Sequence, residues 1–295
     1  MGHHLVLGSG GIRGLSMLGA LHYLYTTGKL TKINKFHGCS IGSVIGVLLI
    51  AGKRPMDIFN DLTAVDFNSY WDPDVANITK YNSLLTHKVF DFFKHILSKL
   101  VDNINITIKD FSTAFNAEVN ILTTCLNSKS LTIMNQYNFP DVPITTAVIA
   151  SCSIPFFYPP VEINNNFYVD GATKVFSGCL NETISKDTVV IKIGYNNENG
   201  PLFTDFKSYA YSIITAMATI EKEIENELSL TIKINEKFYN KHNFNDLSQS
   251  DMVEMFLYGL QQSEVFYRNK LLKKGHSPKD NDKKTKQDTN KTDSD

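Results

Sequence analysis

Two short segments of small residues in this chain have the composition of an ester-cleaving site. Residues 8–14 read Gly-Ser-Gly-Gly-Ile-Arg-Gly directly after the apolar run 5–7, and Ser40 lies between Gly38 and Gly42. A serine on a sharp strand-to-helix turn can project its hydroxyl only if its neighbours are small. A loop of small residues that opens a helix directs free backbone N–H groups at an incoming negative charge. The two segments therefore predict a nucleophile and an oxyanion-binding loop.

The third part of such a site is a base for the serine, and no histidine is well placed to supply it. The usual order is serine, acid, histidine, yet after Asp170 only His242, in a polar loop, and His276, near the end of the chain, remain. Asp170 ends the short apolar stretch 166–169 and precedes Gly171. A carboxylate within about 2.6–3.2 Å of a hydroxyl can take its proton directly. Asp170 is the best candidate base, although such an aspartate can also simply cap its own turn, just as Ser40 could be a plain helix cap.

The elements that must position these groups alternate between strand and helix. We expect a strand over 5–8, a helix over 13–27, a strand over 35–39 and a helix over 41–51. This order favours a parallel strand pair at the centre of an α/β sheet, with both glycine turns at the carboxyl ends of strands. The remaining expected elements are helices over 54–65, 84–100, 144–152, 206–226 and 250–272, strands over 119–126, 130–135, 166–170, 189–193 and 228–234, and an irregular stretch over 66–83.

Composition limits the class of protein. The chain has 295 residues, of which 42% are hydrophobic and 20% charged, as expected for a globular protein with a substantial core. Its formal net charge of −1 argues against a broad nucleic-acid footprint. The four cysteines form no C-x-x-C pair, which argues against zinc and favours reduced, buried thiols in a reducing compartment.

The ends of the sequence and its apolar runs bear on location. We expect no signal peptide and no bilayer-spanning segment, because no apolar run reaches about 18 residues. A cytoplasmic or peripheral membrane location follows. Residues 275–295 contain no aliphatic or aromatic side chain and balance lysine against aspartate. We therefore predict one folded domain over 1–272 and a disordered polar tail over 273–295.

Four sequence blocks, in order, resemble one family. The blocks are Gly8, Gly10, Gly11, Arg13 and Gly14 for a Gly-x-Gly-Gly-x-Arg-Gly loop; Gly38, Ser40 and Gly42 for Gly-x-Ser-x-Gly; the stretch 150–160 for Ala-Ser-x-x-Ile-Pro-x-x-Phe-x-Pro; and Asp170, Gly171 and Ala172 for Asp-Gly-Gly/Ala. Together they resemble the patatin-like phospholipases, lipid acyl hydrolases with a Ser-Asp dyad. The resemblance spans about residues 5–195. Tyr158 and Ser153 depart from the usual Phe and Ala, and neither is a dyad position.

The resemblance implies both a fold and a reaction. The fold would be a three-layer α/β/α domain around a mostly parallel sheet, with residues 196–272 forming variable helices. Ser40 would be the nucleophile and Asp170 the general base. The amides of Gly10 and Gly11 would form the oxyanion hole, with that of Ile41 as a third donor. The substrate would be a phospholipid or another lipid ester, with peripheral membrane contact and without a metal or cofactor.

Several alternatives stay open at this point. Residues 8–14 could form a dinucleotide loop, but that loop needs an acid at the end of the second strand, and this strand ends at the serine turn instead. Arg13 could anchor its helix, the role we favour, or contact a phosphate. The protein could also be a lipid acyltransferase, which uses the same acyl-enzyme, or an inactive lipid-binding scaffold. The sequence leaves headgroup preference and oligomeric state open.

Overall fold

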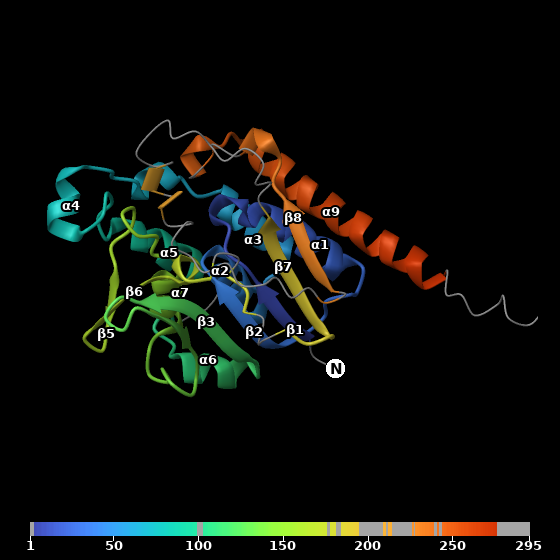
Figure 1. The fold of residues 1–295 in the computed structure, drawn as a ribbon, viewed down its shortest axis with the longest axis horizontal. Helices are drawn as coiled ribbons and strands as arrows, with labels where there is room; N and C mark the ends of the chain where they lie inside the picture. The colour runs from blue at the N-terminus through green and yellow to red at the C-terminus, as the bar shows by residue number, and fades with distance from the viewer. Residues whose placement is uncertain are drawn as a thin grey trace, which may run out of the picture.

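A computed structural model describes residues 3–98, 103–175, 178–180, 184–194, 209–210, 212–213, 226, 228–238, 241 and 244–275 of the chain. Helices flank a central sheet (Figure 1). The chain opens with β1 (His3–Leu7), the 3₁₀-helix η1 (Gly11–Arg13), α1 (Gly14–Thr26), β2 (Ile33–Cys39) and α2 (Ile41–Ile50). The predicted opening order of strand, glycine turn, helix, strand, serine turn and helix is therefore confirmed.

The later elements match the sequence expectations less evenly. They are α3 (Pro55–Thr63), η2 (Phe67–Tyr70), α4 (Ala76–Tyr81), α5 (Lys88–Ser98), α6 (Ile108–Phe115), β3 (Glu118–Cys125), β4 (Ser130–Met134), α7 (Ile144–Cys152), β5 (Val161–Ile163), β6 (Asn166–Asp170), η3 (Gly171–Thr173), β7 (Thr188–Gly194), β8 (Ser229–Lys233), η5 (Glu236–Phe238), η6 (Phe244–Asp246) and α9 (Gln249–Gly275). The stretch 66–83, expected to be irregular, contains η2 and α4, and the expectation for it was wrong there. Neither α6 nor β5 was predicted.

Two predictions concern residues outside the ranges that the structure describes. The helix expected over 206–226 lies almost wholly outside the described ranges, and so does the tail from residue 276 onward. The last helix itself, expected over 250–272, extends to Gly275.

The sheet is mostly parallel, as predicted. In the described part of the chain it has eight strands in the order β5-β6-β3-β2-β1-β7-β8, with β4 also paired to β3. The strands β3, β2, β1, β7 and β8 run parallel, and β4, β6 and β5 join antiparallel at one end. The central parallel strands are almost fully buried, which explains their apolar sequences. The predicted α/β class is confirmed.

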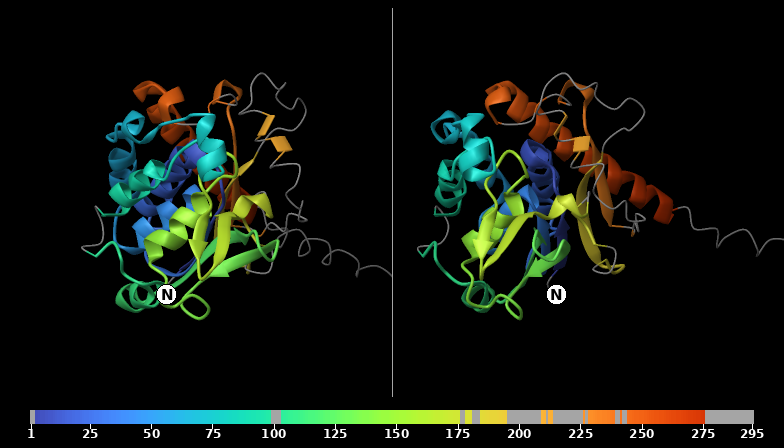
Figure 2. Two further views of the ribbon diagram at one scale, coloured as in Figure 1. Left: turned by 90° about the vertical axis from the view of Figure 1, so that its left-hand side faces the viewer. Right: turned by 60° about the vertical axis from the view of Figure 1, so that its left-hand side comes forward.

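The last helix packs against the first. Helix α9 packs along α1, and Figures 1 and 2 show the two side by side. A Cβ built at Gly19 of α1 would lie 1.8 Å from the carbonyl oxygen of Phe256, and one at Gly259 of α9 would lie 1.8 Å from that of Ser16. A glycine on each helix thus allows the two backbones to touch. Although α9 has 27 residues, no helix in the described part of the chain is both long and apolar enough to cross a membrane.

Candidate active site

Ser40 lies on a strained turn between β2 and α2. Its φ of 55° and ψ of −130° are unusual for a residue with a side chain, and strain of this kind concentrates at functional sites. A Cβ on Gly42 would lie 2.5 Å from the carbonyl oxygens of both Leu7 and Gly8. Only glycine fits there, because the turn after β2 passes directly against the end of β1. The Ser40 side chain lies in the interior, with 5% of the residue exposed.

The end of helix α7 holds this turn in place. The Ser40 amide donates to Ser151 Oγ at 2.9 Å, and the Ser151 hydroxyl donates to the Leu122 carbonyl at 2.6 Å. The Ser43 hydroxyl donates to the Ser40 carbonyl at 2.6 Å. Ser151 lies in the 150–160 block, but the sequence assigned it no role. Its role depends on the fold, which brings the end of α7 against β3 and the turn after β2.

The pairing of β3 explains why Ser40 and Asp170 meet. β4 occupies one edge of β3 from residue 121 to 125. The other edge is therefore shared by β2, which pairs with residues 118–122, and by β6, which pairs with 123–125. β2 runs parallel to β3 and ends at Cys39 opposite Leu122, while β6 runs antiparallel and ends at Asp170 opposite Thr123. The carboxyl ends of β2 and β6 thus abut, one residue apart along β3.

Asp170 is buried but well supplied with hydrogen bonds. Its amide donates to the Ser153 carbonyl at 2.9 Å, and its Oδ1 accepts the Ala172 amide at 2.9 Å. Only 3% of the residue is exposed. Burial raises the pKa of the Asp170 carboxyl from 3.8 to about 6, and hydrogen bonds from the Ser40 side chain, the Ala172 amide and Cys39 act in the opposite direction. A carboxyl with this pKa is largely ionised at neutral pH and can accept a proton there.

The glycine-rich loop lies against the serine turn because β1 and β2 are neighbours, with Leu7 paired to Gly38. Gly8 donates its amide to the Ile191 carbonyl at 3.0 Å and so closes β1 onto β7. Gly11 has a φ of +54°, which a side chain would strain, whereas a Cβ on Gly10 would lie 2.8 Å from Ile193 Cγ1. These contacts fix the path of the loop past the serine turn.

The other motif glycines are sites of close approach. A Cβ on Gly14 would lie 2.5 Å from Ile41 Cγ1, one on Gly38 would lie 2.8 Å from Ser43 Cα, and one on Gly171 would lie 2.7 Å from the Leu122 carbonyl oxygen. Gly14 and Gly38 thus lie against the residues that follow Ser40, and Gly171 lies against β3 beside Cys39.

Arg13 has a partner outside the motif. It is 4% exposed, and its Nη2 donates to the Phe238 carbonyl in η5 at 3.2 Å. This contact ties the start of α1 to the segment that precedes α9. It supports the structural interpretation of Arg13 over the phosphate contact.

The described histidines have other partners than Ser40 and Asp170. His37 is hydrogen-bonded to His4 at 2.9 Å, and the ring of His22 packs against that of Phe256. His242 and His276 lie outside the described residues. The four cysteines are buried thiols, as predicted, and are not joined in disulfides. Within the described ranges, no three His, Cys, Asp or Glu side chains gather as metal ligands.

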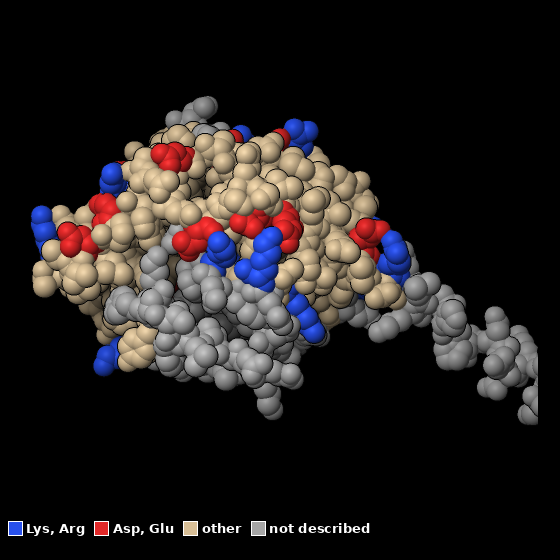
Figure 3. All heavy atoms as spheres, turned by 90° about the horizontal axis from the view of Figure 1, so that it is seen from above, with Lys and Arg blue, Asp and Glu red and all other residues tan. Residues whose placement is uncertain are grey.

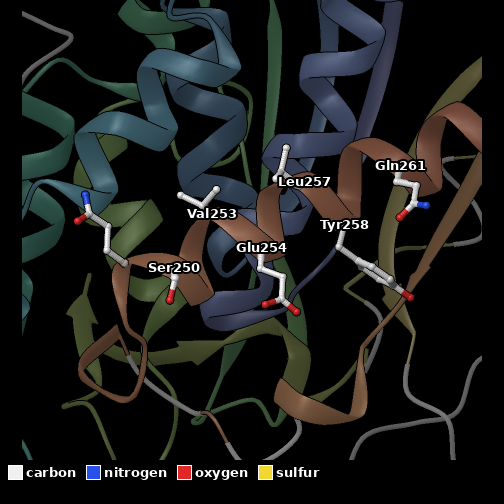
Figure 4. A pocket seen from close by; sticks show the side chains of 7 residues that line it. Ser250, Val253, Glu254, Leu257, Tyr258 and Gln261 are labelled. Atoms are coloured by element: carbon white, nitrogen blue, oxygen red, sulfur yellow. The ribbon is translucent and has the colours of Figure 1, made fainter.

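A surface hollow lies along α9 and is separate from these motifs. Within the described ranges, the side chains that line it come from that one helix and include Val253, Leu257 and Tyr258 (Figure 4). None of these belongs to an element that carries the serine turn, Asp170 or the glycine loop, so this described lining is not part of the candidate site.

Comparison with known proteins identifies a family and a fold. A family model described as patatin-like phospholipase matches residues 5–177, more than half of the chain. A probable lipid hydrolase of invertebrate iridescent virus 6 is 30% identical over 176 residues, which cover 57% of this chain and 58% of that protein. Triacylglycerol lipase 4 of Saccharomyces cerevisiae is 24% identical over 253 residues, 78% of this chain and 27% of that protein.

A solved structure shares the fold. VipD from Legionella pneumophila superposes with a TM-score of 0.52 at 14% identity, covering 91% of this chain and 67% of VipD. At this identity the likeness concerns the fold alone. The aligned region spans 58% of the viral relative and 27% of the yeast one, so each relative has further sequence with no counterpart in its alignment.

Proposed function

The chain belongs to the patatin-like phospholipase family, and from this we propose that it hydrolyses the carboxylic esters of lipids, as a phospholipase A or a related acyl hydrolase. The observation that carries the proposal is the meeting of Ser40 and Asp170 at the abutting ends of β2 and β6. The names of the relatives include both a lipid hydrolase and a triacylglycerol lipase. We therefore expect the substrate to be a phospholipid or another lipid ester.

The proposed reaction has two half-reactions through an acyl-enzyme. Asp170 accepts the Ser40 proton while Ser40 Oγ attacks the ester carbonyl, and the proton then passes to the departing alcohol. In the second half, Asp170 takes a proton from water, whose hydroxide attacks the acyl-serine. Ser40 recovers the proton as the fatty acid leaves. Every proton is returned, so the cycle needs no cofactor.

The electrostatics of Asp170 support its role as the base. A general base works best when its pKa is close to the working pH, and burial has raised the pKa of Asp170 to about 6. The hydrogen bond from the Ser40 side chain aligns the hydroxyl with the carboxylate before reaction. A carboxylate with an ordinary pKa would be a weaker base for the serine.

The glycine loop supplies the third part of the proposed mechanism. We assign the amides of Gly10 and Gly11 as oxyanion donors, with Ile41 as a third at the start of α2. The support is the tight packing of the loop against the serine turn, where Gly42 lies against the Gly8 carbonyl. Donors held rigidly in a buried site stabilise a developing oxyanion without reorganising.

A peripheral contact with a lipid surface is part of the proposal. On the face drawn in Figure 3, the described acidic and basic side chains are interspersed. Elsewhere in the described chain, too, charges pair with their opposites: Lys237 is paired with Asp251 and Glu254. The described charges on this face do not form a patch of one sign, so we propose that contact there depends on apolar side chains rather than on these charges.

Two other functions remain as alternatives. An acyltransferase would pass the same acyl group to an alcohol, and an inactive relative would only bind lipid. The intact Ser40 and Asp170 argue against the inactive form. Product analysis with and without an alcohol acceptor distinguishes the hydrolase from the transferase, because only the transferase forms a new ester.

A fluorophosphonate probe tests the proposal directly. The wild-type protein should be labelled and Ser40→Ala should not be. Ser263→Ala is the matched control, because Ser263 is also fully buried but lies on α9, where its hydroxyl faces the Ala20 carbonyl. Labelling that persists in Ser40→Ala, or no ester hydrolysis by the wild-type protein, would count against the proposed function.

A further inference from the structure

We propose that Cys39 is a positioning residue for Asp170: its thiol donates to one carboxylate oxygen and so leaves the other to face Ser40. This inference rests on the proposed function, because it concerns the base of the same dyad. It adds a residue that the family motifs do not single out, since Cys39 occupies a variable position of Gly-x-Ser-x-Gly.

The contact follows from the way the two strands end. Cys39 is the last residue of β2 and Asp170 the last of β6, and these ends abut along β3. Cys39 Sγ lies 3.7 Å from Asp170 Oδ1, as a donor to it. The Ala172 amide donates to the same oxygen at 2.9 Å. Because both donors use Oδ1, the carboxylate is held by one oxygen, and Oδ2 is the one we assign to the Ser40 hydroxyl.

The thiol is held on both sides by glycine backbone. A Cβ on Gly171 would lie 3.0 Å from Cys39 Sγ, and one on Gly178 would lie 3.1 Å from Sγ and 2.6 Å from Cys39 Cβ. Cys39 is fully buried. With this packing the side chain has little space for another rotamer, so the S–H group stays directed at the carboxylate.

The surroundings also keep the thiol protonated. Burial raises the pKa of Cys39 well above its ordinary value, and the nearby charge of Asp170 raises it further. Since a thiolate is the nucleophilic form of cysteine, Cys39 does not compete with Ser40. Toward an ionised carboxylate, a protonated thiol acts as a hydrogen-bond donor.

A donor to Asp170 has a definite electrostatic effect. Burial pushes the pKa of Asp170 upward, and the hydrogen bond from Cys39 pulls it down. If the donor is lost, a larger fraction of Asp170 is protonated at a given pH and cannot accept the serine proton. Loss of the thiol should therefore shift the acidic side of the pH–rate profile to higher pH.

The test is the pH dependence of kcat/KM on a soluble p-nitrophenyl ester. Cys39→Ala removes the donor, and we expect the acidic limb to move up by about half a pH unit, as a net bond of under about 1 kcal/mol implies. Cys39→Ser keeps a donor, and its limb should stay at or below the wild-type position. Cys125→Ala is the control, because Cys125 is also buried at the end of a strand but pairs opposite Tyr168.

Other outcomes would overturn the inference. A rate that falls equally at every pH, with the limb unmoved, would mean that Cys39 only fills space. The proposal would also be contradicted if the acidic limb of the pH–rate profile moved up as far in Cys39→Ser as in Cys39→Ala. If the alanine variant does not fold, the serine variant decides alone: a limb above the wild-type position overturns the proposal, and one at or below it supports the proposal.

A second measurement separates this inference from the proposed function. Titration of ¹³C-labelled aspartate carboxyls by NMR reports the pKa of Asp170 without turnover, and Asp170→Asn identifies the signal. A wild-type protein that cleaves no ester would refute the proposed function. The Asp170 pKa in Cys39→Ala, compared with that in the wild-type protein, would still test the donor.

Discussion

Two buried polar clusters at strands of the sheet respond to burial with pKa shifts in opposite directions. The first cluster is Ser40 with Asp170, and the second is His37 with His4. Burial raises the pKa of Asp170 to about 6, and it lowers the pKa of His4 to about 4 and that of His37 to about 3. In each case burial disfavours the charged form.

The two clusters differ in the hydrogen bonds and ion pairs that their polar groups make. His4 Nε2 bonds His37 Nδ1 at 2.9 Å, and His4 Nδ1 bonds Thr188 Oγ1 at 3.0 Å. Lys35 and Glu118, which act on both imidazoles, pair with each other at 3.1 Å. The two imidazoles are thus neutral, and their hydrogen bonds are made to each other and to Thr188. Asp170 is instead held by donors at one oxygen and titrates close to neutral pH, which is what a base requires.

Removing either member of the proposed dyad is expected to have the largest effect. Ser40→Ala and Asp170→Asn should each lower kcat by about 10⁴-fold or more, and the double variant should be barely worse, because residues that act as a unit are not additive. In the other cluster, His37→Gln should leave kcat within a few-fold of wild type. Turnover on a soluble ester measures all four. Near-normal turnover by Asp170→Asn would remove the dyad from the mechanism.

Bulk in the glycine loop should have the next largest effect. Gly11 has positive φ, so valine there would move the loop, while its added Cβ meets no atom within 4 Å. We expect a loss of about 10²–10³ in kcat, the typical effect of one misplaced oxyanion donor, with a nearly normal melting temperature. Kinetics paired with thermal unfolding test this. Wild-type turnover by Gly11→Val would show that the loop is not an oxyanion hole.

Asp170→Asn should also make the protein more stable at neutral pH. The folded-state pKa, about 6, lies above the ordinary 3.8, so the ionised carboxylate destabilises the fold above about pH 6. Removing the charge should raise the free energy of unfolding by up to about 3 kcal/mol, at 1.36 kcal/mol for each pKa unit. Urea unfolding at pH 7.5 and pH 4 should show a gain that shrinks as the pH falls through 6. An equal change at both values would contradict the raised pKa.

The histidine pair should make the free energy of unfolding depend on pH in the opposite direction. Its folded pKa values lie below the ordinary 6.5, so the unfolded chain binds these protons first, and stability falls as the pH drops from about 6.5 toward 4. The double variant His4→Gln/His37→Gln should lose up to about 4 kcal/mol less than wild type between pH 7 and pH 5, about 2 kcal/mol for each imidazole. Parallel stability curves for the two proteins would mean that the imidazoles are already charged in the folded state.

The smallest expected effect belongs to the ion pair beside the histidines. Lys35 lowers the pKa of both His4 and His37, so Lys35→Gln should raise both slightly. Its partly exposed contact with Glu118 should contribute less than about 1 kcal/mol to stability. NMR titration of the imidazoles measures the shift. A downward shift would contradict the assigned direction.

Much of the site could be predicted because its parts are local. Gly11 meets the demand of its own turn for a positive φ, and the apolar run 5–7 and the helix over 144–152 are marked by short-range pattern. The same reasoning missed β5, which has three residues, and misjudged α4, which has no buried residue to give it a periodic pattern. Short or solvent-facing elements depend on their neighbours more than on their own sequence.

By itself the sequence determined which segments carry chemistry: the serine turn, the Asp-Gly turn and the glycine loop, each of which needs particular residues at particular backbone positions. Only the tertiary structure decided that β6 runs antiparallel to β3 and meets β2 end to end. That meeting places Ser40, Cys39 and Asp170 together, and the burial it creates sets the pKa of Asp170. Strand pairing and burial depend on contacts between residues distant in the chain, so no local pattern encodes them.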